Sequence, residues 1–229
     1  RNTFRVARFA RVQAIHMKRL IIAGAGGFAR EVYAWAEAHP DCGRLWEIAG
    51  FLDDNPAALD GFNYPVNILE SVIDYAPQPN DLFLCAIGSP AIKRRVCEKL
   101  LGLGAEFTSL VHPTVVIGLH VEIGVGAIVC PHAIVTCDVV IGDFVTINCH
   151  SSIGHDVRIA DWVTLSGHCD VTGQADLGEM AFLGSGARIL PLKKVGARAM
   201  VGAGSVVINH VPANAKVFGN PARIFDTKG

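Results

Sequence analysis

One pattern constrains the fold of this chain more than any other: an aliphatic residue returns at every sixth position over nearly half of the sequence. A period of six matches neither a helix face, which repeats about every 3.6 residues, nor a strand, which alternates every two. It is typical of a parallel β-helix, in which each hexad forms one side of a coil. The seventeen positions are Val111, Ile117, Ile123, Val129, Val135, Ile141, Ile147, Ile153, Ile159, Leu165, Val171, Leu177, Leu183, Ile189, Val195, Val201 and Val207.

The other positions of the hexads agree with this prediction. The second position is glycine in eight of the seventeen hexads, and the fifth position is valine or a small residue in nearly all of them. The narrow interior of such a helix explains this, since it accepts one branched and one small residue on each side. Because three hexads make one coil, residues i and i+18 should stack about 4.8 Å apart, the spacing of strands in a sheet.

Composition narrows the class of protein. The 229 residues include 20 basic and 21 acidic side chains, which argues against nucleic acid or an acidic membrane surface as the main partner. The sequence contains no apolar run of 18 residues, so it predicts no transmembrane helix. The seven cysteines have neither CxxC pairs nor metal-ligand spacing, so we expect reduced thiols in a cytoplasmic protein.

Residues 1–16 differ from the rest of the chain, since they contain four arginines and no acid, and a clean strand pattern begins after Met17. We interpret them as a leader or added extension that precedes a natural start at Met17. An organellar transit peptide is the alternative, because the segment is basic and amphipathic.

The next part, residues 17–107, predicts a small Rossmann-like α/β domain. An apolar run at 18–23 leads into a glycine-rich turn and then a helix at 30–38, the context in which backbone amides receive phosphate. Two more predicted strands, at 47–52 and 81–87, end at one edge of the same parallel sheet, where ligands bind. The residues expected along that edge are Gly26, Gly27, Asp53, Asp54 and Gly88.

The size of this domain favours a mononucleotide or sugar nucleotide over a dinucleotide. About 90 residues hold only half of a six-stranded dinucleotide fold. The spacing G-x-G-x-x-A after the first strand matches the dinucleotide fingerprint, but a tight turn with close strand–helix packing explains it too. Asp53 and Asp54 can hydrogen-bond a ribose or base edge, and a solvated turn before Asn55 is the alternative for Asp54.

In the second domain, residues 108–229, the 18-residue rule places candidate catalytic groups together. His155 should stack against Gly173, and Asp156 should lie between Asp138 and Gln174. An imidazole beside a carboxylate is oriented and more basic, which suits proton abstraction near neutral pH. The backbone at Gly173 can offer an N–H group to a developing oxyanion. A surface histidine with a chance acidic neighbour is the alternative.

Three further histidines, His132, His150 and His168, are spaced 18 residues apart and should stack in one column. Such a column can bind metal in a hexapeptide-repeat protein. Spacings of about 4.8 and 9.6 Å are, however, too large for three ligands of one tetrahedral zinc within one subunit. We therefore favour a stacked ladder at a subunit interface.

The hexads and the segment from Ile147 to Asp156 resemble bacterial amino-sugar acetyltransferases with left-handed β-helices. These include enzymes that acetylate nucleotide-linked 4-amino sugars and the related sialic acid O-acetyltransferases. The resemblance extends from Met17 to Ile224. Further matching segments are Ala25-Gly26-Gly27, Phe51-Leu52-Asp53-Asp54, Ala86-Ile87-Gly88 and Gly219-Asn220-Pro221-Ala222-Arg223.

The resemblance implies an acetyl-CoA-dependent enzyme without metal, in which His155 is the general base and Asp156 raises its basicity. It implies a homotrimer that binds acetyl-CoA between neighbouring subunits. Some relatives have histidine at the position of Thr164, so that cofactor contact should be weaker or different here. The implied cofactor-binding residues are Thr164, Gly173, Ser185 and Ala203, and exposed Arg188, Lys193, Lys194, Arg198 and Arg223 can serve CoA phosphates. The implied acceptor-binding residues are Gly26, Gly27, Phe28, Asp53, Asp54 and Gly88.

We therefore predict transfer of an acetyl group from acetyl-CoA to the amine of a nucleotide-activated amino sugar. O-acetylation of a sugar such as sialic acid is the closest alternative, because the same His–Asp pair can activate a hydroxyl. A metal-dependent hydratase would use the histidine column. A non-catalytic scaffold would leave the His–Asp pair unexplained, and a redox enzyme is disfavoured by the short α/β domain.

Overall fold

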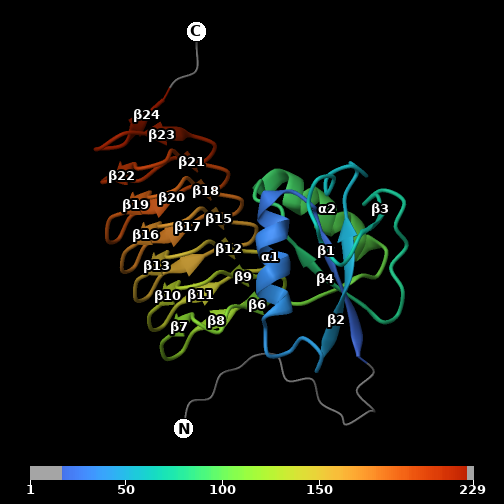
Figure 1. Cartoon of the computed structure of the whole chain (residues 1–229). Coiled ribbons are helices and arrows are strands. Elements are labelled where there is room, and N and C mark those ends of the chain that lie inside the picture. Colours follow the sequence, from blue (N-terminus) through green and yellow to red (C-terminus); the bar gives the residue numbers. More distant parts are fainter. Residues whose placement is uncertain (1–16, 226–229) are drawn as a thin grey trace. The chain divides into compact units, whose positions relative to one another are not determined.

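The computed structural model describes residues 17–225, and the predicted leader, residues 1–16, lies outside the described residues. The chain divides into two compact units, with the boundary between Leu110 and Val111. The first is an α/β unit and the second is built from short stacked strands (Figure 1). Between residues 17 and 225, no helix has the length and apolar character needed to cross a membrane.

The α/β unit contains a five-stranded sheet in the order β3-β2-β1-β4-β5, and every neighbouring pair is parallel. Both helices begin where a strand has just ended in a glycine-containing turn, as the sequence predicted for the first of them. The two short strands β3 and β5 extend the sheet beyond the three predicted strands. The elements are β1 (Lys18–Ala23), α1 (Gly27–Glu37), β2 (Trp46–Leu52), β3 (Ile68–Glu70), β4 (Asp81–Cys85), α2 (Pro90–Gly102) and β5 (Glu106–Phe107).

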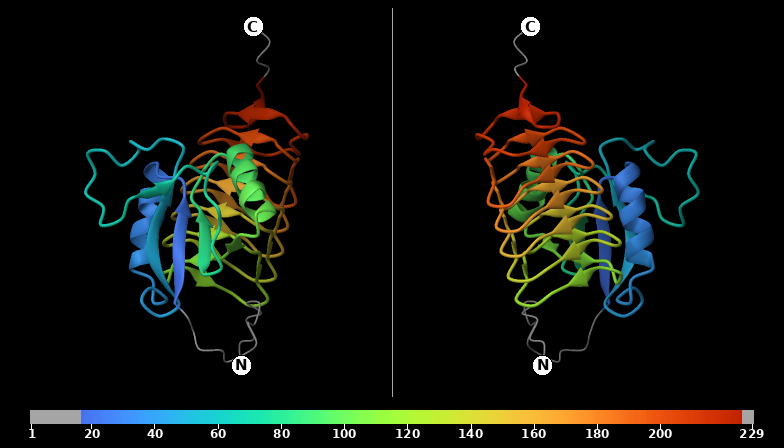
Figure 2. Two further views of the ribbon diagram at one scale, coloured as in Figure 1. Left: turned by 90° about the vertical axis from the view of Figure 1, so that its right-hand side faces the viewer. Right: turned by 90° about the vertical axis from the view of Figure 1, so that its left-hand side faces the viewer.

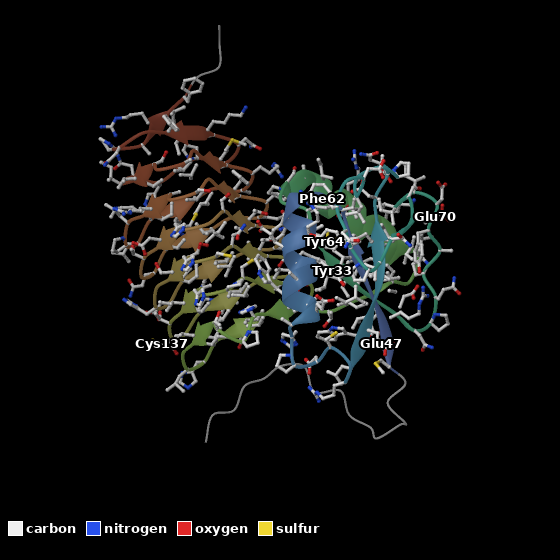
Figure 3. All side chains as sticks on the ribbon, in the orientation of Figure 1. Tyr33, Glu47, Phe62, Tyr64, Glu70 and Cys137 are labelled. Atoms are coloured by element: carbon white, nitrogen blue, oxygen red, sulfur yellow. The ribbon has the colours of Figure 1, made fainter. Side chains whose placement is uncertain are left out.

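The core of this unit explains its continuous apolar strands. All residues of β4 are buried, as are the last four of β1, which is typical of parallel strands covered on both faces. Tyr33 of α1, Phe51 of β2 and Tyr64 form an aromatic cluster with ring centroids 5.2–5.9 Å apart. Tyr33 and Tyr64 are labelled in Figure 3. The 53–71 loop, which contains Tyr64, is thereby packed against the sheet and α1.

The second unit consists of three sheets of two- and three-residue strands, stacked coil upon coil (Figures 1 and 2). All of its pairs are parallel except β23–β24. The eight-stranded sheet contains β6 (Leu110–Val111), β9 (Ile128–Val129), β12 (Thr146–Ile147), β15 (Thr164–Leu165), β18 (Phe182–Leu183), β21 (Met200–Val201), β23 (Lys216–Phe218) and β24 (Arg223–Ile224). The six-stranded sheet contains β7 (Val116–Ile117), β10 (Ile134–Val135), β13 (Ser152–Ile153), β16 (Asp170–Val171), β19 (Arg188–Ile189) and β22 (Val206–Val207). The five-stranded sheet contains β8 (Glu122–Ile123), β11 (Val140–Ile141), β14 (Arg158–Ile159), β17 (Asp176–Leu177) and β20 (Lys194–Val195).

The strand register follows the 18-residue rule. Ile153 pairs with Val171, and Ile147 pairs with Leu165, so the aliphatic residues of the hexads form continuous columns in the core. The predicted architecture, an α/β Rossmann-like unit followed by a left-handed parallel β-helix, is confirmed.

The corners of the β-helix have a conformation that the sequence did not predict. Thirteen non-glycine residues between 17 and 225 have φ of 55–66°, and all of them lie in the β-helix. This left-handed region costs an L-residue roughly 1–2 kcal/mol, and aspartate, asparagine and histidine tolerate it best. The corners therefore carry strained residues that the stacked coils hold in place, among them Asp138, His150 and Asp156.

Candidate functional site

His155 and Asp156 form a hydrogen-bonded pair on a corner of the β-helix, just after β13. His155 Nδ1 lies 2.7 Å from Asp156 Oδ2. A carboxylate only accepts hydrogen bonds, so Nδ1 carries the proton and Nε2 of the neutral ring keeps a free lone pair. The side chains are 60% and 52% exposed, so a substrate can reach them. The pair is thus arranged as a base with an orienting acid.

Gly173 supports this pair from the next coil. A Cβ atom at position 173 would lie 2.5 Å from His155 Nε2 and 2.6 Å from Cε1, so only glycine leaves space for the ring there. The corner backbones are joined by a hydrogen bond from the Gln174 N–H to the His155 carbonyl, 2.8 Å long. The structure therefore places His155, Asp156 and Gly173 together, as the 18-residue rule predicted.

The histidine column lies on a different corner. The rings of His132, His150 and His168 are stacked with centroids 5.1 and 5.0 Å apart and planes within 18° of parallel. The predicted stack is confirmed, whereas its position at a subunit interface remains a prediction. No group of three or more His, Cys, Asp or Glu residues in the described part of the chain has the geometry to hold a metal ion.

In the α/β unit, one pocket of about 360 Å³ is bordered by all six residues predicted to bind the acceptor. Neither helix start has a side-chain cap. The N–H groups in the first turn of α1, and those that follow Pro90 at the start of α2, therefore remain available to a ligand. A Cβ atom at Gly26 or Gly88 would meet nothing within 4 Å, so these positions border open space. The six predicted residues are Gly26, Gly27, Phe28, Asp53, Asp54 and Gly88.

The two aspartates of this pocket have different environments. Asp53 Oδ2 accepts a hydrogen bond from the Ala25 N–H at 2.7 Å, and its Oδ1 accepts one from the Asn55 N–H at 2.9 Å. Asp53 therefore fixes the glycine-rich turn after β1. Asp54 Oδ1 accepts a hydrogen bond from the Val72 N–H at 3.0 Å. This bond uses only one of the two carboxylate oxygens, so Oδ2 of Asp54 can accept a hydrogen bond from a ligand.

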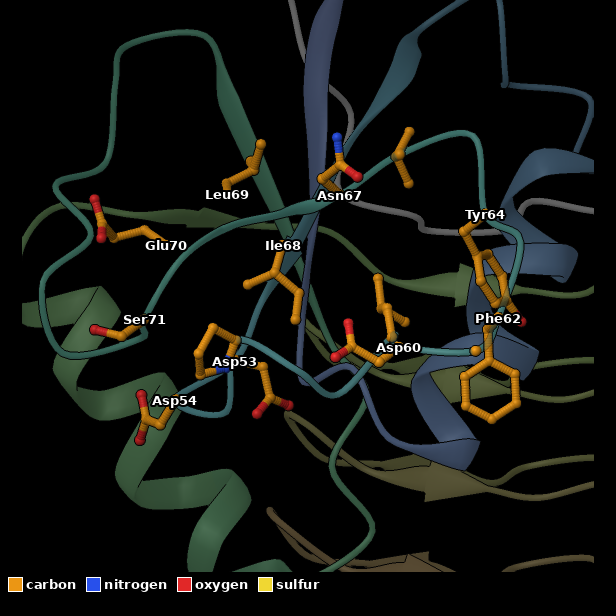
Figure 4. A pocket seen from close by; sticks show the side chains of 14 residues that line it. Asp53, Asp54, Asp60, Phe62, Tyr64, Asn67, Ile68, Leu69, Glu70 and Ser71 are labelled. Carbon is orange, nitrogen blue, oxygen red and sulfur yellow. The ribbon is translucent and has the colours of Figure 1, made fainter.

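Two features of this region were missed by sequence reasoning. Arg95, on α2, also borders the 360 Å³ pocket, and the only sequence signal for it was the basic character of that helix. A larger pocket of about 670 Å³ lies on the other side of the two aspartates, where the 53–71 loop folds over (Figure 4). It contains Asp60 and Glu70 and, unlike the smaller pocket, has no glycine-rich turn.

The residues predicted to contact acetyl-CoA do not gather around His155 within one chain. Thr164 is on β15 and is only 4% exposed. Ser185 and Ala203 are exposed and stack on the corner that also contains His168. Of the predicted set, only Gly173 lies beside His155. A cofactor that contacts the whole set would have to touch more than one corner.

Comparison with known proteins agrees with this picture. Residues 19–100 match the family described as the PglD N-terminal domain. The chain is 32% identical over 121 residues to UDP-N-acetylbacillosamine N-acetyltransferase of Bacillus subtilis strain 168, a match that covers 49% of this chain and 51% of that protein. The chain thus spans about half the length of that curated relative.

Two solved structures match nearly the whole chain. The acetyltransferase domain of PglB from Neisseria gonorrhoeae, in complex with acetyl coenzyme A, has a TM-score of 0.83 and 28% identity, covering 92% of this chain and 100% of that one. PerB from Caulobacter crescentus, in complex with CoA and GDP-perosamine, has a TM-score of 0.82 and 28% identity, covering 93% and 100%. The fold of this chain is therefore similar to that of the acetyltransferases that these two structures represent. The predicted resemblance to enzymes that acetylate nucleotide-linked amino sugars is confirmed.

Proposed function

We propose that this protein is an acetyl-CoA-dependent N-acetyltransferase that acts on the amine of a nucleotide-linked amino sugar. The observation that carries the proposal is the His155–Asp156 pair beside the open backbone of Gly173. Relatives with CoA, acetyl-CoA and a nucleotide-linked sugar in their structures support the same pair of substrates here.

The reaction needs no covalent enzyme intermediate. The amine nitrogen attacks the thioester carbonyl, a C–N bond forms, and the C–S bond then breaks. The amine proton passes to His155 Nε2, which has a free lone pair because Nδ1 donates to Asp156. The CoA thiolate leaves and takes the proton back from His155, which returns the ring to its neutral form. The carboxylate of Asp156 stabilises the imidazolium that forms during the transfer.

For the acceptor, we propose that the nucleotide occupies the 360 Å³ pocket of the α/β unit. The uncapped starts of α1 and α2 supply N–H groups and positive ends of helix dipoles for phosphate oxygens. Asp54 is the carboxylate with an oxygen left for a ribose or base edge. Asp53 acts indirectly by holding the glycine-rich turn.

For the cofactor, we propose that acetyl-CoA binds between subunits of a homotrimer. The separation of Ser185 and Ala203 from His155 on different corners supports this, since a neighbouring subunit can bring one corner against another. The test is sedimentation with and without acetyl-CoA. A monomer that transfers acetyl groups at full rate would contradict this part of the proposal.

The catalytic assignment is tested with His155→Gln. Turnover should fall by about 10²–10⁴-fold, the usual contribution of a general base, whereas the Kd for acetyl-CoA should stay within about twofold. His210→Gln is the matched control, because His210 is an exposed β-helix histidine whose Nδ1 accepts the Lys194 N–H. Unchanged turnover in His155→Gln would rule the assignment out.

The acceptor is tested by following CoA thiol release with a panel of nucleotide-linked amino sugars, matched hydroxyl analogues and free sialic acid. Mass spectrometry of the product locates the acetyl group. We expect release only with nucleotide-linked amines. Activity confined to hydroxyl acceptors would show a sugar O-acetyltransferase instead.

A further inference from the structure

A second histidine–aspartate pair lies on the same ridge as His155 and Asp156. His120 Nδ1 is 2.9 Å from Asp138 Oδ1. Asp138 and Asp156 occupy equivalent corner positions on successive coils, and both have left-handed φ, 58° and 60°. The proposed mechanism does not use this pair.

Asp138 is held in place from two sides. It accepts hydrogen bonds from the His120 ring and from the Cys137 thiol, and these hold its pKa below its ordinary value, with the His120 bond as the largest cause. Cys137 is one coil before His155 in the same column, and its carbonyl accepts the Asp156 N–H at 3.1 Å. Asp138 is therefore an ionised and oriented carboxylate at neutral pH.

Asp138 lies close to His155 through the stacking of the coils. The Asp156 N–H donates to the Cys137 carbonyl at 3.1 Å, so Asp138, which follows Cys137, lies one coil before the His155–Asp156 pair. His155 thus has two carboxylates on one side, Asp156 within hydrogen-bond distance and Asp138 one coil before it. The coil after it presents Gly173 and Gln174, which do not titrate.

The second pair is not a second active site. His155 has room because the residue 18 positions later is Gly173. For His120 the residue 18 positions later is Asp138 itself, so no open backbone lies beside its ring. The structure gives His120 the role of a donor to Asp138.

We infer that Asp138, oriented by His120, is a positioning residue for the proposed reaction, which stabilises the protonated form of His155 from the adjacent coil. This inference rests on the proposed function for its catalytic meaning. When His155 takes the amine proton, the new positive charge is balanced by Asp156 and Asp138 together. The titratable groups near this corner are His120, Cys137, Asp138 and Asp156, and the charged side chains of the adjoining strands are Glu122, Arg158, Asp170 and Asp176.

Asp138→Asn is the decisive variant. Asparagine tolerates the left-handed backbone and keeps an oxygen acceptor, so the fold should persist while the charge is lost. The acid limb of the kcat/KM–pH profile should move to lower pH by about 0.3–0.7 units, the range expected for exposed charges. The shift should shrink in 1 M NaCl, where the Debye length falls to about 3 Å. Asp138→Glu, which keeps the charge, should titrate like the unmodified protein.

The matched control is Asp161→Asn on the next corner. Asp161 Oδ1 accepts the Asp143 N–H, and asparagine keeps this bond while removing one negative charge. Its pH profile should coincide with that of the unmodified protein. If Asp138→Asn also coincides with it, or if both variants shift equally, the inference is wrong.

A second measurement separates this inference from the proposed function. The His155 ring can be titrated by NMR of histidine-labelled protein, which needs no substrate. Its titration midpoint should be lower in Asp138→Asn by the same amount. If no acetyl transfer is detected with any acceptor, the proposed function fails, whereas an unmoved NMR midpoint refutes the coupling of Asp138 to His155.

Discussion

The β-helix and the α/β unit bring distant residues together in different ways. In the β-helix, the functional neighbours are spaced 18 residues apart, as with His155 and Gly173 or His120 and Asp138. In the α/β unit, Asp53 accepts a hydrogen bond from Ala25, 28 residues away, and Lys99 donates one to the Val72 carbonyl, 27 residues away. No sequence repeat predicts either contact. A repetitive fold lets geometry be calculated from sequence number, whereas a wound sheet does not.

The two regions also differ in their buried charge. The interior of the β-helix contains apolar side chains in regular columns. The α/β unit buries Lys93 of α2 to 1% exposure, and burial lowers the pKa of this lysine to about 8. The repeat leaves no place for such a residue, since every inward position is stacked on an equivalent one.

The largest expected effect tests the columns of the β-helix. Ile147→Ala should lower the free energy of unfolding by about 2–5 kcal/mol, because Ile147 is fully buried and alanine leaves a cavity. Ile134→Ala is the control, because the outward-facing Ile134 is 45% exposed and should change stability by less than about 0.5 kcal/mol. Urea denaturation measures both. Similar losses in the two variants would contradict the division into inward and outward positions.

The next effect tests the buried charge of the α/β unit. Lys93→Met should raise the free energy of unfolding at pH 7, by up to about 3 kcal/mol for a pKa lowered from 10.5 to about 8. Below pH 8 lysine is charged in both states and the full burial cost applies. Between pH 8 and 10.5 the folded protein releases the proton first, so the cost fades as pH rises.

The measurement is the stability difference between Lys93→Met and the unmodified protein from pH 7 to pH 10.5. Taking the difference cancels the ionisation of the tyrosines and of the cysteines other than Cys85 and Cys97, which interact with Lys93. We expect it to be positive at pH 7 and to shrink towards pH 10.5. A difference that is constant over this range would show that burial of the charge is not its cause.

A smaller effect returns to the β-helix corner. Gly173→Ala should displace the His155 ring, because the added Cβ would lie 2.5 Å from Nε2, and should lower kcat/KM about 100-fold. Stability should change little, since a side chain rather than backbone has to move. Gly167→Ala is the control, because its Cβ would lie at an ordinary 3.5 Å from the Cys149 carbonyl oxygen. Equal activity of the two variants would refute the role of Gly173.

The smallest effect tests the turn that Asp53 holds. Asp53→Asn keeps one acceptor for two backbone N–H groups, so the Kd for UDP or GDP should rise about tenfold. Asp60→Asn is the control, because the exposed Asp60 borders only the larger pocket. Calorimetric titration gives both values. Unchanged affinity in Asp53→Asn would mean that the turn is stable without this side chain.

Much of the fold could be predicted from the sequence, and the misses have physical causes. The strands β1, β2 and β4 were predicted because buried parallel strands are continuous apolar runs. The strands β3 and β5 were missed because segments of two or three residues have no pattern to recognise. The left-handed corners were missed because residues as different as His132, Phe144 and Met180 occupy them. The residue type at a corner therefore does not predict its φ angle.

More of the candidate site could be predicted in the β-helix than in the α/β unit. The 18-residue spacing led to His155, Asp156 and Gly173, and the same rule applied to His120 would have found Asp138. Arg95 had no comparable signal, because its place beside the pocket depends on how α2 packs on the sheet. The different surroundings of Asp53 and Asp54 likewise depend on which backbone N–H groups the loops bring within reach.

By itself, the sequence determined the β-helix, its register and the partners of each corner residue. The reason is that a six-residue repeat converts sequence separation directly into distance. The tertiary structure alone decided that Asp53 holds a turn, that Lys93 is buried and that Arg95 borders the smaller pocket. Those outcomes depend on side-chain directions and on contacts between segments without regular spacing, and no local pattern encodes them.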